Sequence, residues 1–280
     1  MKQDFVFANP PYSGSLHQII YNKCIKVLKP KTGQMTIIQP ATTIQNKREQ
    51  PRGTPPKQMQ NNLEKYYSEI IVEDGTVFKD ALISTDLTIT TVKMDKPTNG
   101  NIDKLTNKDG TVYTDVPLED ISMCQMPPMT FKSIRNKFED CVLTHGSLKD
   151  ISVLDKLNPQ KHYISIARIR GHRGPEGLKA DFYTHFAFAN TKNTDNISLG
   201  LECVPGEEEN MYHYLTTYVA RFALALLKFN TDTQLRLVPL VDFSTKKTDE
   251  ELFEMLNLTE DEQTAIKLVI TDWHHYGKEV

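Results

Sequence analysis

Apolar and polar positions along the first 40 residues predict a strand, a helix and a second strand. Residues 3–8 (QDFVFA) are an apolar run that ends at Asn9-Pro10-Pro11-Tyr12, where two prolines prevent the strand from continuing. Apolar residues at helical spacing then extend from Leu16 to Leu28. Residues 34–39 (QMTIIQ) predict a second, buried strand. This alternation is typical of an α/β domain.

The same domain is expected to continue after a polar, basic and proline-bearing loop over 45–58. We expect a helix over 58–68, a strand over 70–73, and a further strand over 84–94, in which apolar and polar residues alternate. Residues 98–127 are rich in Pro, Asn, Asp and Gly and predict a linker. The first domain therefore covers residues 1–97 in this interpretation.

The second half of the chain predicts an α+β domain over 128–245, followed by a helical tail over 246–280. In the tail, Thr248 with Glu251 and Thr259 with Glu262 form capping-box patterns, which mark the starts of two short helices. The expected helices of the domain are 129–139 and 207–229, and the expected strands are 162–169, 182–189 and 197–204.

The net charge of −3 conceals an uneven distribution of charge along the chain. Residues 1–60 carry nine basic and two acidic side chains, and residues 160–192 carry six and two, whereas residues 243–280 carry four and nine. The two basic segments are compatible with a surface that faces a polyanion such as DNA. They are also compatible with solvated charged faces, so charge alone does not select a function.

Composition argues against membrane, secreted and metal-binding classes. No apolar run approaches the ~18 residues that a membrane helix needs, and the N-terminus reaches Pro10 before a signal-peptide core could form. The four cysteines are scattered without a C-x-x-C pair, which favours neither a zinc site nor a disulfide framework. We therefore expect a cytoplasmic protein that has no metal site and does not bind a membrane.

The tetrapeptide Asn9-Pro10-Pro11-Tyr12 is the sharpest chemical feature of the sequence. The exocyclic amine of adenine is a weak nucleophile because its lone pair is delocalised into the ring, so its methylation needs acceptors that hold the N–H hydrogens. The Asn9 side-chain oxygen and the Pro10 carbonyl, presented by a proline-locked turn, provide two such acceptors. Tyr12 would stack on the adenine base after the base has been flipped out of the DNA double helix. A rigid turn without chemistry is the alternative.

Residues 9–17 (NPPYSGSLH), with the helix and the strand GQMTIIQPATTI that follow, resemble the catalytic motif region of the amino-methylating, S-adenosylmethionine-dependent DNA methyltransferases. The closer similarity is to adenine methylases of the gamma order, including those of type IIG restriction–modification enzymes. The segment VEDGTVFKDALISTDLTITTV resembles a later hairpin of that domain, where an aromatic residue packs on the target base; Phe78 is the matching residue. HYISIARIRGHRG and VPLVDFSTKKTDEELFEMLNLTEDE are similar to the target-recognition region.

The resemblance implies a fold, a cofactor and an activity. The fold is α/β: the C-terminal half of a Rossmann-like methyltransferase sheet, followed by an α+β target-recognition domain with a helical tail. The activity is transfer of a methyl group from S-adenosylmethionine to the N6 amine of a flipped adenine in double-stranded DNA. Asn9, Pro10, Pro11 and Tyr12 would be catalytic, and Tyr12 and Phe78 would stack on the base.

One departure from the family pattern concerns the cofactor. The glycine loop that binds S-adenosylmethionine precedes the catalytic motif in the family, whereas here eight residues precede Asn9 and no G-x-G occurs in the chain. Gly171, Gly174 and Gly177 lie in a basic loop and do not open a helix after an apolar strand. We therefore expect weak binding of S-adenosylmethionine by this chain alone and a partner polypeptide that supplies the cofactor-binding half. Strand 3–8 would then be an exposed or partner-paired edge.

Two basic groups of residues are candidates for DNA contacts. Arginine reads guanine or clamps phosphates. Arg168 and Arg170 continue the face of the strand that Ile164 and Ile166 begin, which suits a strand that leaves the core to meet a ligand. A solvated strand end and loop is the alternative. The candidate DNA-binding residues are Arg48, Arg52, Arg168, Arg170, His172, Arg173 and Lys179.

Two rival functions stay open at the level of sequence. The first is a catalytically inactive DNA-binding specificity subunit, or a remnant of a restriction–modification system, in which the tetrapeptide persists only as a turn. The second is methylation of a different nitrogen, because the same tetrapeptide serves glutamine side chains and guanine in RNA. Those enzymes usually carry their extra domain before the methylase core, whereas here about 160 residues follow it, which favours DNA.

Overall fold

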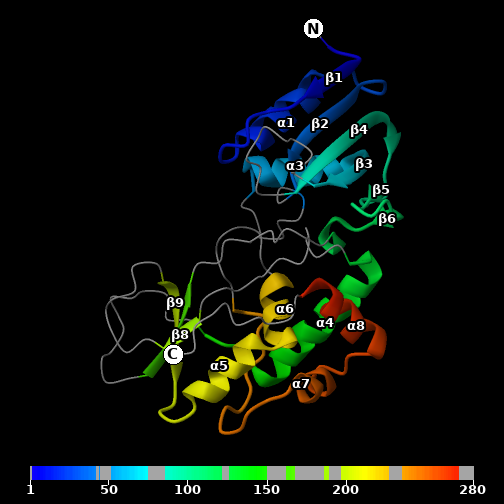
Figure 1. The fold of residues 1–280 in the computed structure, drawn as a ribbon. Coiled ribbons are helices and arrows are strands. Elements are labelled where there is room, and N and C mark those ends of the chain that lie inside the picture. Colours follow the sequence, from blue (N-terminus) through cyan, green and yellow to red (C-terminus); the bar gives the residue numbers. More distant parts are fainter. Residues whose placement is uncertain are drawn as a thin grey trace. The chain divides into compact units, whose positions relative to one another are not determined.

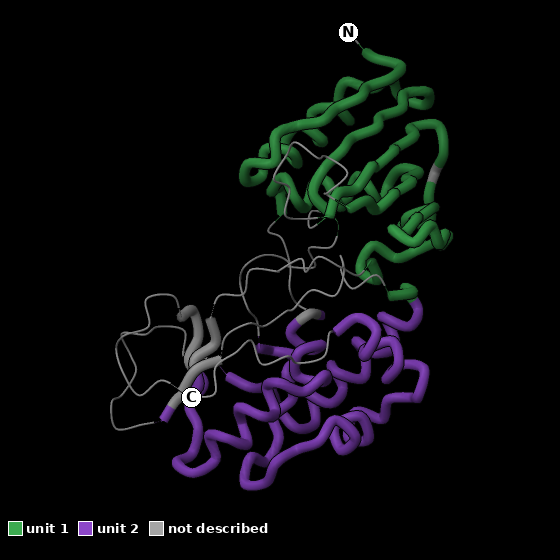
Figure 2. Tube along the Cα trace, in the orientation of Figure 1, with its two compact units in different colours: residues 1–128 green, residues 129–280 purple. Residues whose placement is uncertain are grey.

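The computed structural model describes residues 2–41, 44, 52–74, 86–121, 126–149, 162–167, 186–188, 197–226 and 235–270. The chain divides into two compact units, residues 1–128 and residues 129–280 (Figure 2). Both units combine helices with a sheet, so the chain is a mixed α/β protein. Within the described residues, no helix has the length and the apolar composition that crossing a membrane requires.

Unit 1 is built on a six-stranded mixed sheet in the order β1-β2-β4-β3-β5-β6 (Figure 1). β1 and β2 run parallel and are connected through α1, whereas β4 lies antiparallel between β2 and β3. β3 and β5 are parallel, and β5 and β6 form a hairpin. The elements are β1 (Phe5–Ala8), α1 (Leu16–Val27), β2 (Gln34–Pro40), α3 (Pro55–Lys65), β3 (Tyr66–Glu73), β4 (Leu87–Pro97), β5 (Ile102–Thr106), β6 (Val112–Val116) and a 3-10 turn, Leu118–Asp120.

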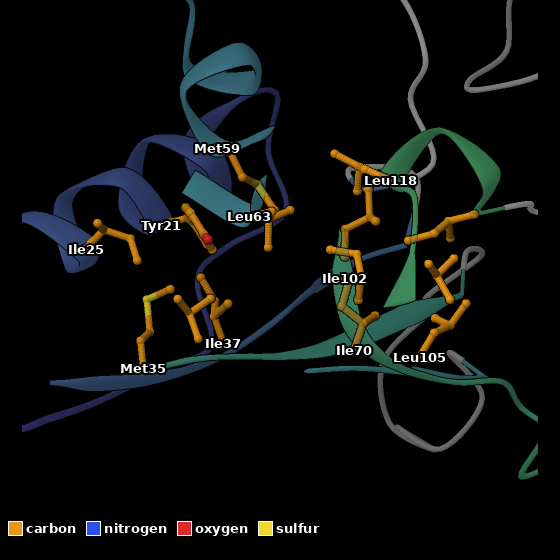
Figure 3. Packing of buried hydrophobic residues seen from close by; sticks show 14 of the residues in the cluster. Tyr21, Ile25, Met35, Ile37, Met59, Leu63, Ile70, Ile102, Leu105 and Leu118 are labelled. Carbon is orange, nitrogen blue, oxygen red and sulfur yellow. The ribbon is translucent and has the colours of Figure 1, made fainter. Parts of the chain in front are cut away.

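Alternation along the strands decides which face of this sheet is buried. Met35 and Ile37 of β2 are fully buried and lie in one cluster with Tyr21 of α1 and with Met59 and Leu63 of α3 (Figure 3). The residues between them on β2 point to the opposite face and are only partly buried. In the described part of unit 1, helices therefore cover one face of the sheet.

β1 lies at the edge of the sheet, and this confirms the prediction for strand 3–8 within the described residues. It pairs with β2 and with no other described strand. Val6 and Ala8 are half-buried against the core, whereas Phe5 and Phe7 are 56% and 62% exposed. The strand therefore presents its two largest side chains to solvent.

The structure corrects the predicted linker over 98–127. Residues Ile102–Thr106 and Val112–Val116 are the strands β5 and β6, and Ile102, Leu105 and Val116 are buried in the core of unit 1. The polar composition was misleading because Asn, Asp and Gly gather in the tight turn that ends at Gly110, where φ is +81°. The strands themselves need only a few apolar residues, because each buries only one side.

Two further boundaries in unit 1 differ from the prediction. The helix expected over 58–68 is α3 (Pro55–Lys65), which begins earlier than predicted. Two prolines occupy its first turn, where a backbone N–H has no partner within the helix and its loss costs no hydrogen bond. The strand expected over 70–73 is longer and begins at Tyr66. β3 and β4 pair antiparallel, and the segment 72–92 that resembles a hairpin contains the last two residues of β3 and the first six of β4.

Unit 2 combines a three-stranded antiparallel sheet, in the order β8-β7-β9, with five helices among its described residues. Its three strands lie within the predicted ranges. The helices α7 and α8 pack against α6, so the predicted helical tail belongs to the body of this unit. The elements are α4 (Pro128–His145), β7 (His162–Ala167), β8 (Phe186–Phe188), β9 (Ile197–Cys203), α5 (Glu208–Thr216), α6 (Tyr218–Leu226), α7 (Asp249–Met255) and α8 (Glu260–Val269).

The single helix predicted over 207–229 is two helices, and Thr217 separates them. Its backbone is extended, with φ −66° and ψ 157°. Its hydroxyl donates to the Tyr214 carbonyl over 2.6 Å and accepts from the Ala220 N–H over 3.2 Å, so one side chain ends α5 and begins α6. The apolar spacing continues through the break, which is why periodicity alone predicted one helix.

A buried carboxylate joins α8 to α4 in unit 2. Glu262 accepts hydrogen bonds from Lys137 over 2.7 Å and from Ser133 over 2.6 Å, and it completes the capping box with Thr259. Burial alone would raise the pKa of Glu262, but the hydrogen bonds from Lys137 and Ser133 hold it below its ordinary value. The charged form is therefore the one that the fold stabilises.

We predict that Glu262→Ala destabilises the chain by about 2–3 kcal/mol, because it removes charge-assisted hydrogen bonds and a cap. Since the folded pKa is depressed, the contribution of Glu262 is present above its unfolded value of 4.5 and is lost as the pH falls through the folded pKa. Thermal unfolding followed by circular dichroism at neutral and at acidic pH measures both effects. Glu260→Ala, an exposed residue in the same helical turn, is the matched control and should be nearly neutral.

Candidate functional site

The tetrapeptide follows β1 at the end of the sheet where several strands finish together. This carboxyl end is shared by four strands that run in the same direction: β1, β2, β3 and β5. In open α/β sheets, ligands bind outside the carboxyl ends of such strands. Pro10 is buried, whereas Asn9 is exposed and Tyr12 is half-buried. The turn is thus anchored in unit 1 while it presents a polar and an aromatic side chain.

Asn9 and Tyr12 contact each other directly across the two prolines. The Tyr12 hydroxyl donates a hydrogen bond of 2.9 Å to Asn9 Oδ1. An amide oxygen has two lone pairs, so Oδ1 keeps one for a second donor. Burial raises the pKa of Tyr12 above its ordinary value of 10.0, so its hydroxyl stays protonated and able to donate near neutral pH.

This hydrogen bond was not predicted from the sequence, which assigned to Tyr12 only the role of stacking on a base. The signal was present in principle: two fixed proline φ angles hold residues 9 and 12 close to each other. The bond adds a second property to Tyr12, because it orients the Asn9 amide. Gly14, with φ +52°, then turns the chain toward α1 in a conformation that favours glycine.

Lys108 forms ion pairs that connect three segments at the same end of the sheet. It lies in the turn between β5 and β6, and its Nζ is 2.7 Å from Asp86 Oδ1 and 3.6 Å from Asp74 Oδ2. Asp74 follows β3 and Asp86 precedes β4, while the Asp86 carbonyl accepts a hydrogen bond from the Ala41 N–H after β2. All three charged side chains are largely shielded from solvent.

The candidate residues differ in how the structure places them. Asn9, Pro10, Pro11 and Tyr12 are brought together in one turn, and Arg52 is exposed just before α3. Ile164 of β7 is buried, as the alternation predicted. Phe78, Arg48, Arg168, Arg170, His172, Arg173 and Lys179 lie outside the described residues.

A cluster on the face of the sheet that no described helix covers was also not predicted from the sequence. The ring of Tyr67 lies 5.0 Å from Lys93 Nζ and 4.8 Å from Lys96 Nζ, and its hydroxyl donates to Glu69 over 2.8 Å. The hydrogen bond to Glu69, together with burial, raises the pKa of Tyr67 to about 12. Alternation places Tyr67, Glu69 and Lys93 on one face, whereas Lys96 lies where the pairing of β3 with β4 shifts register between Tyr66 and Tyr67.

Two searches bear on the nature of these groups. Among the described residues, no three His, Cys, Asp or Glu side chains gather in a way that would hold a metal ion. Scans against protein-family models and against curated proteins found no match.

We predict that Lys108→Met destabilises unit 1 by about 1–3 kcal/mol, because two shielded carboxylates lose their shared cation. The melting temperature, measured by scanning calorimetry at pH 7, should fall. Lys23→Met removes an exposed lysine of α1 and is the control that should leave the melting temperature unchanged. Equal melting temperatures for the two variants would show that the Lys108 pairs do not support the fold.

Proposed function

We propose that this chain carries the catalytic motif and the target-recognition part of an adenine-N6 DNA methyltransferase. The observation that carries the proposal is the turn Asn9-Pro10-Pro11-Tyr12 at the carboxyl end of a parallel strand, with an exposed amide oxygen beside a half-buried aromatic ring. The resemblance of this segment to the amino-methylating DNA methyltransferases supports the same proposal. In this interpretation unit 1 is the C-terminal half of a Rossmann-like sheet and unit 2 is the recognition domain.

The residues of the turn have distinct roles in the proposed reaction. The Asn9 Oδ1 lone pair left by Tyr12 and the Pro10 carbonyl accept the two N–H hydrogens of the adenine amine, which localises its lone pair on nitrogen. The Tyr12 ring stacks on the flipped base, and its hydroxyl holds the Asn9 amide in orientation. The proline-fixed backbone holds both acceptors in position before the base arrives.

The methyl donor implied by the resemblance, S-adenosylmethionine, does not fit the described residues of this chain. The glycines of unit 1 that have positive φ, Gly14, Gly53, Gly100 and Gly110, lie in open turns where an added Cβ would meet nothing within 4 Å. None is a cradle that brings the backbone close to a ligand, and the chain has no G-x-G. We propose that a further polypeptide, separate or continuous with this one, supplies the cofactor-binding half.

A catalytically inactive DNA-binding subunit is the second candidate function. The lack of a glycine cradle among the described residues favours it, because a remnant would keep the Asn9–Tyr12 turn for structure only. Both candidates use the basic segment at 160–192 to bind duplex DNA, so DNA binding alone does not separate them.

We predict that methyl transfer depends on Asn9. Asn9→Ala should lower the rate by at least about a hundredfold, on the order of 3 kcal/mol, because an acceptor that stabilises the reacting amine is removed. DNA affinity should be unchanged, since the amide acts on the rate. Tyr12→Ala should cost roughly 1–3 kcal/mol of base stacking. Tyr12→Phe keeps the ring and loses only the bond to Asn9, so it should cost no more than about tenfold.

The assay is transfer of a tritiated methyl group to duplex DNA by this chain, complemented with the glycine-loop half of a gamma-order adenine methyltransferase. Ser13→Ala, an exposed residue next to the motif, is the control variant and should keep full activity. Full activity of Asn9→Ala would show that the tetrapeptide is a structural turn without a catalytic role. DNA binding without any methyl transfer by the complemented wild-type chain would favour the inactive subunit.

A separate prediction concerns DNA binding by residues 160–192. Replacing Arg168, Arg170 and Arg173 with Ala should weaken duplex binding and flatten the log–log salt dependence by about 0.9 for each phosphate that is no longer neutralised. Fluorescence anisotropy over a salt series measures the slope. The triple variant Lys246→Ala, Lys247→Ala, Lys267→Ala removes equal charge from the acidic C-terminal region and should change the slope less. Equal slopes for the wild type and the arginine variant would place these arginines away from DNA.

A further inference from the structure

The outer edge of β1 is bridged by Leu28 at Gln3, and beyond that bridge no described strand pairs with it. The Gln34 N–H donates to the Asp4 carbonyl over 2.8 Å, so the main-chain groups of Asp4 face β2. In a parallel pair, alternate residues bond to the neighbouring strand. The N–H and C=O groups of Phe5 and Phe7 therefore point away from β2, where no described strand pairs with them. Natural edges of this kind are open to the addition of a strand.

The side chains of the same two residues form an apolar surface. Phe5 and Phe7 are the most exposed large apolar residues described in unit 1, at 56% and 62%. Register places Phe7 beside Thr36 and, across β2, Thr91, on the face of the sheet that no described helix covers. A strand with one aromatic and one aliphatic face is typical of the interior of a sheet, where both faces are buried.

The opposite edge of the sheet has a different character. β6 reads VYTDV, and Asp115 breaks it with a positive φ of 57°. The Asp115 carboxylate accepts hydrogen bonds from the Asn99 and Asn101 amides, so polar groups and an irregular backbone protect this edge. At β1, the segment after α1 covers only the start of the outer edge, where Leu28 bridges Gln3, and two prolines follow the strand. The two edges of one sheet therefore differ in their readiness to accept a strand.

Charge around β1 restricts the kind of strand that it would accept. Four exposed lysines lie before β1, on α1 and after α1: Lys2, Lys23, Lys26 and Lys31. The one acidic side chain nearby in sequence, Asp4, is paired with Lys29 over 2.7 Å. A second copy of this chain would bring two such basic surfaces together, whereas an acidic partner would neutralise them.

We propose that the outer edge of β1 docks a β-strand of a partner polypeptide, with apolar side chains over Phe5 and Phe7 and acidic residues facing the flanking lysines. Main-chain hydrogen bonds to Phe5 and Phe7 supply affinity, and the two rings supply specificity. The added strand would lie next to β1, which ends directly before Asn9. The partner would therefore extend the sheet beside the candidate site. The docking surface follows from β1 itself; the identity of the partner as the cofactor-binding half rests on the proposed function.

The first experiment uses a fluorescent peptide of about ten residues, with valine at alternate central positions and glutamate at both ends. Anisotropy should show saturable binding to the full chain, and hydrogen exchange should slow at residues 5–8. The same peptide with lysine for glutamate should bind at least about tenfold more weakly. No saturable binding of the glutamate peptide, or equal binding of both peptides, would overturn the proposal.

The discriminating variant is Phe7→Pro. Proline is tolerated on an edge strand where its N–H would face solvent, so the melting temperature should change little while peptide binding falls at least about tenfold. If Phe7→Pro unfolds the chain, its N–H is used internally and the proposal fails. Phe5→Lys, which leaves the backbone intact, should independently weaken binding. Val112→Lys, on the protected edge at β6, is the matched control and should bind the peptide as the wild type does.

Two further outcomes separate this proposal from the proposed function. In the complementation assay, Phe7→Pro should lose both the complex and methyl transfer, whereas Asn9→Ala should lose transfer and keep the complex. Peptide binding without any methyl transfer would support the docking surface and contradict the proposed enzymatic function. Full methyl transfer by Phe7→Pro would support the enzymatic function and contradict the docking surface. A concentration-dependent dimer in sedimentation, absent in Phe7→Pro, would assign the edge to a second copy and overturn the acidic partner.

Discussion

Burial of one face of the unit 1 sheet beneath α1 and α3 is the constraint on which the rest of that unit depends. Met35 and Ile37 pack with Tyr21, and because side chains alternate along a strand, this packing sets the register of β2 against both of its neighbours. A slip of one residue would exchange these apolar side chains for Gln34, Thr36 and Ile38. Through the pairing with β1, the same packing turns Val6 inward and Phe7 outward.

The candidate site depends on the direction in which the strands of this sheet run. Because β1, β2, β3 and β5 share one direction, the Asn9 turn and the Lys108 ion pairs lie along the same edge of the sheet. The proline pair leaves the turn little conformational freedom, and the Tyr12 hydroxyl removes most of what the Asn9 side chain retains. A preorganised acceptor of this kind is what stabilisation of a reacting amine requires, and it does not depend on residues outside unit 1.

The same geometry connects the proposed function with the proposed partner. A site at the end of β1 has a neighbouring strand on one side, β2, and an open edge on the other among the described strands. The residues that would stack on a base and hold its amine come from this chain, whereas the described residues offer no cradle for the methyl donor. The exposed Phe5 and Phe7 therefore lie at the edge where we propose that a complementary polypeptide docks.

Local patterns predicted the elements that depend on a single strong signal. The strand before the tetrapeptide, α1, β2 and both capping boxes of the C-terminal helices occur where the sequence placed them. Prediction failed where composition and periodicity conflicted with packing. Residues 102–116 were predicted as linker because their polar turn dominated the composition, and α5 and α6 were joined because Thr217 interrupts the helix without interrupting its apolar spacing.

The sequence by itself determined which residues carry the candidate chemistry, because the Asn9-Pro10-Pro11-Tyr12 turn is built from neighbours along the chain whose geometry two prolines restrict. It also determined that β1 is apolar on both faces. Only the tertiary structure decided that Tyr12 donates to Asn9, that Lys108 joins Asp74 and Asp86, and that Phe5 and Phe7 face solvent at the end of a sheet. The Tyr12 hydrogen bond is local, but it depends on side-chain rotamers that the sequence does not specify. The other two facts depend on strand register and on contacts between distant segments, which no local pattern encodes.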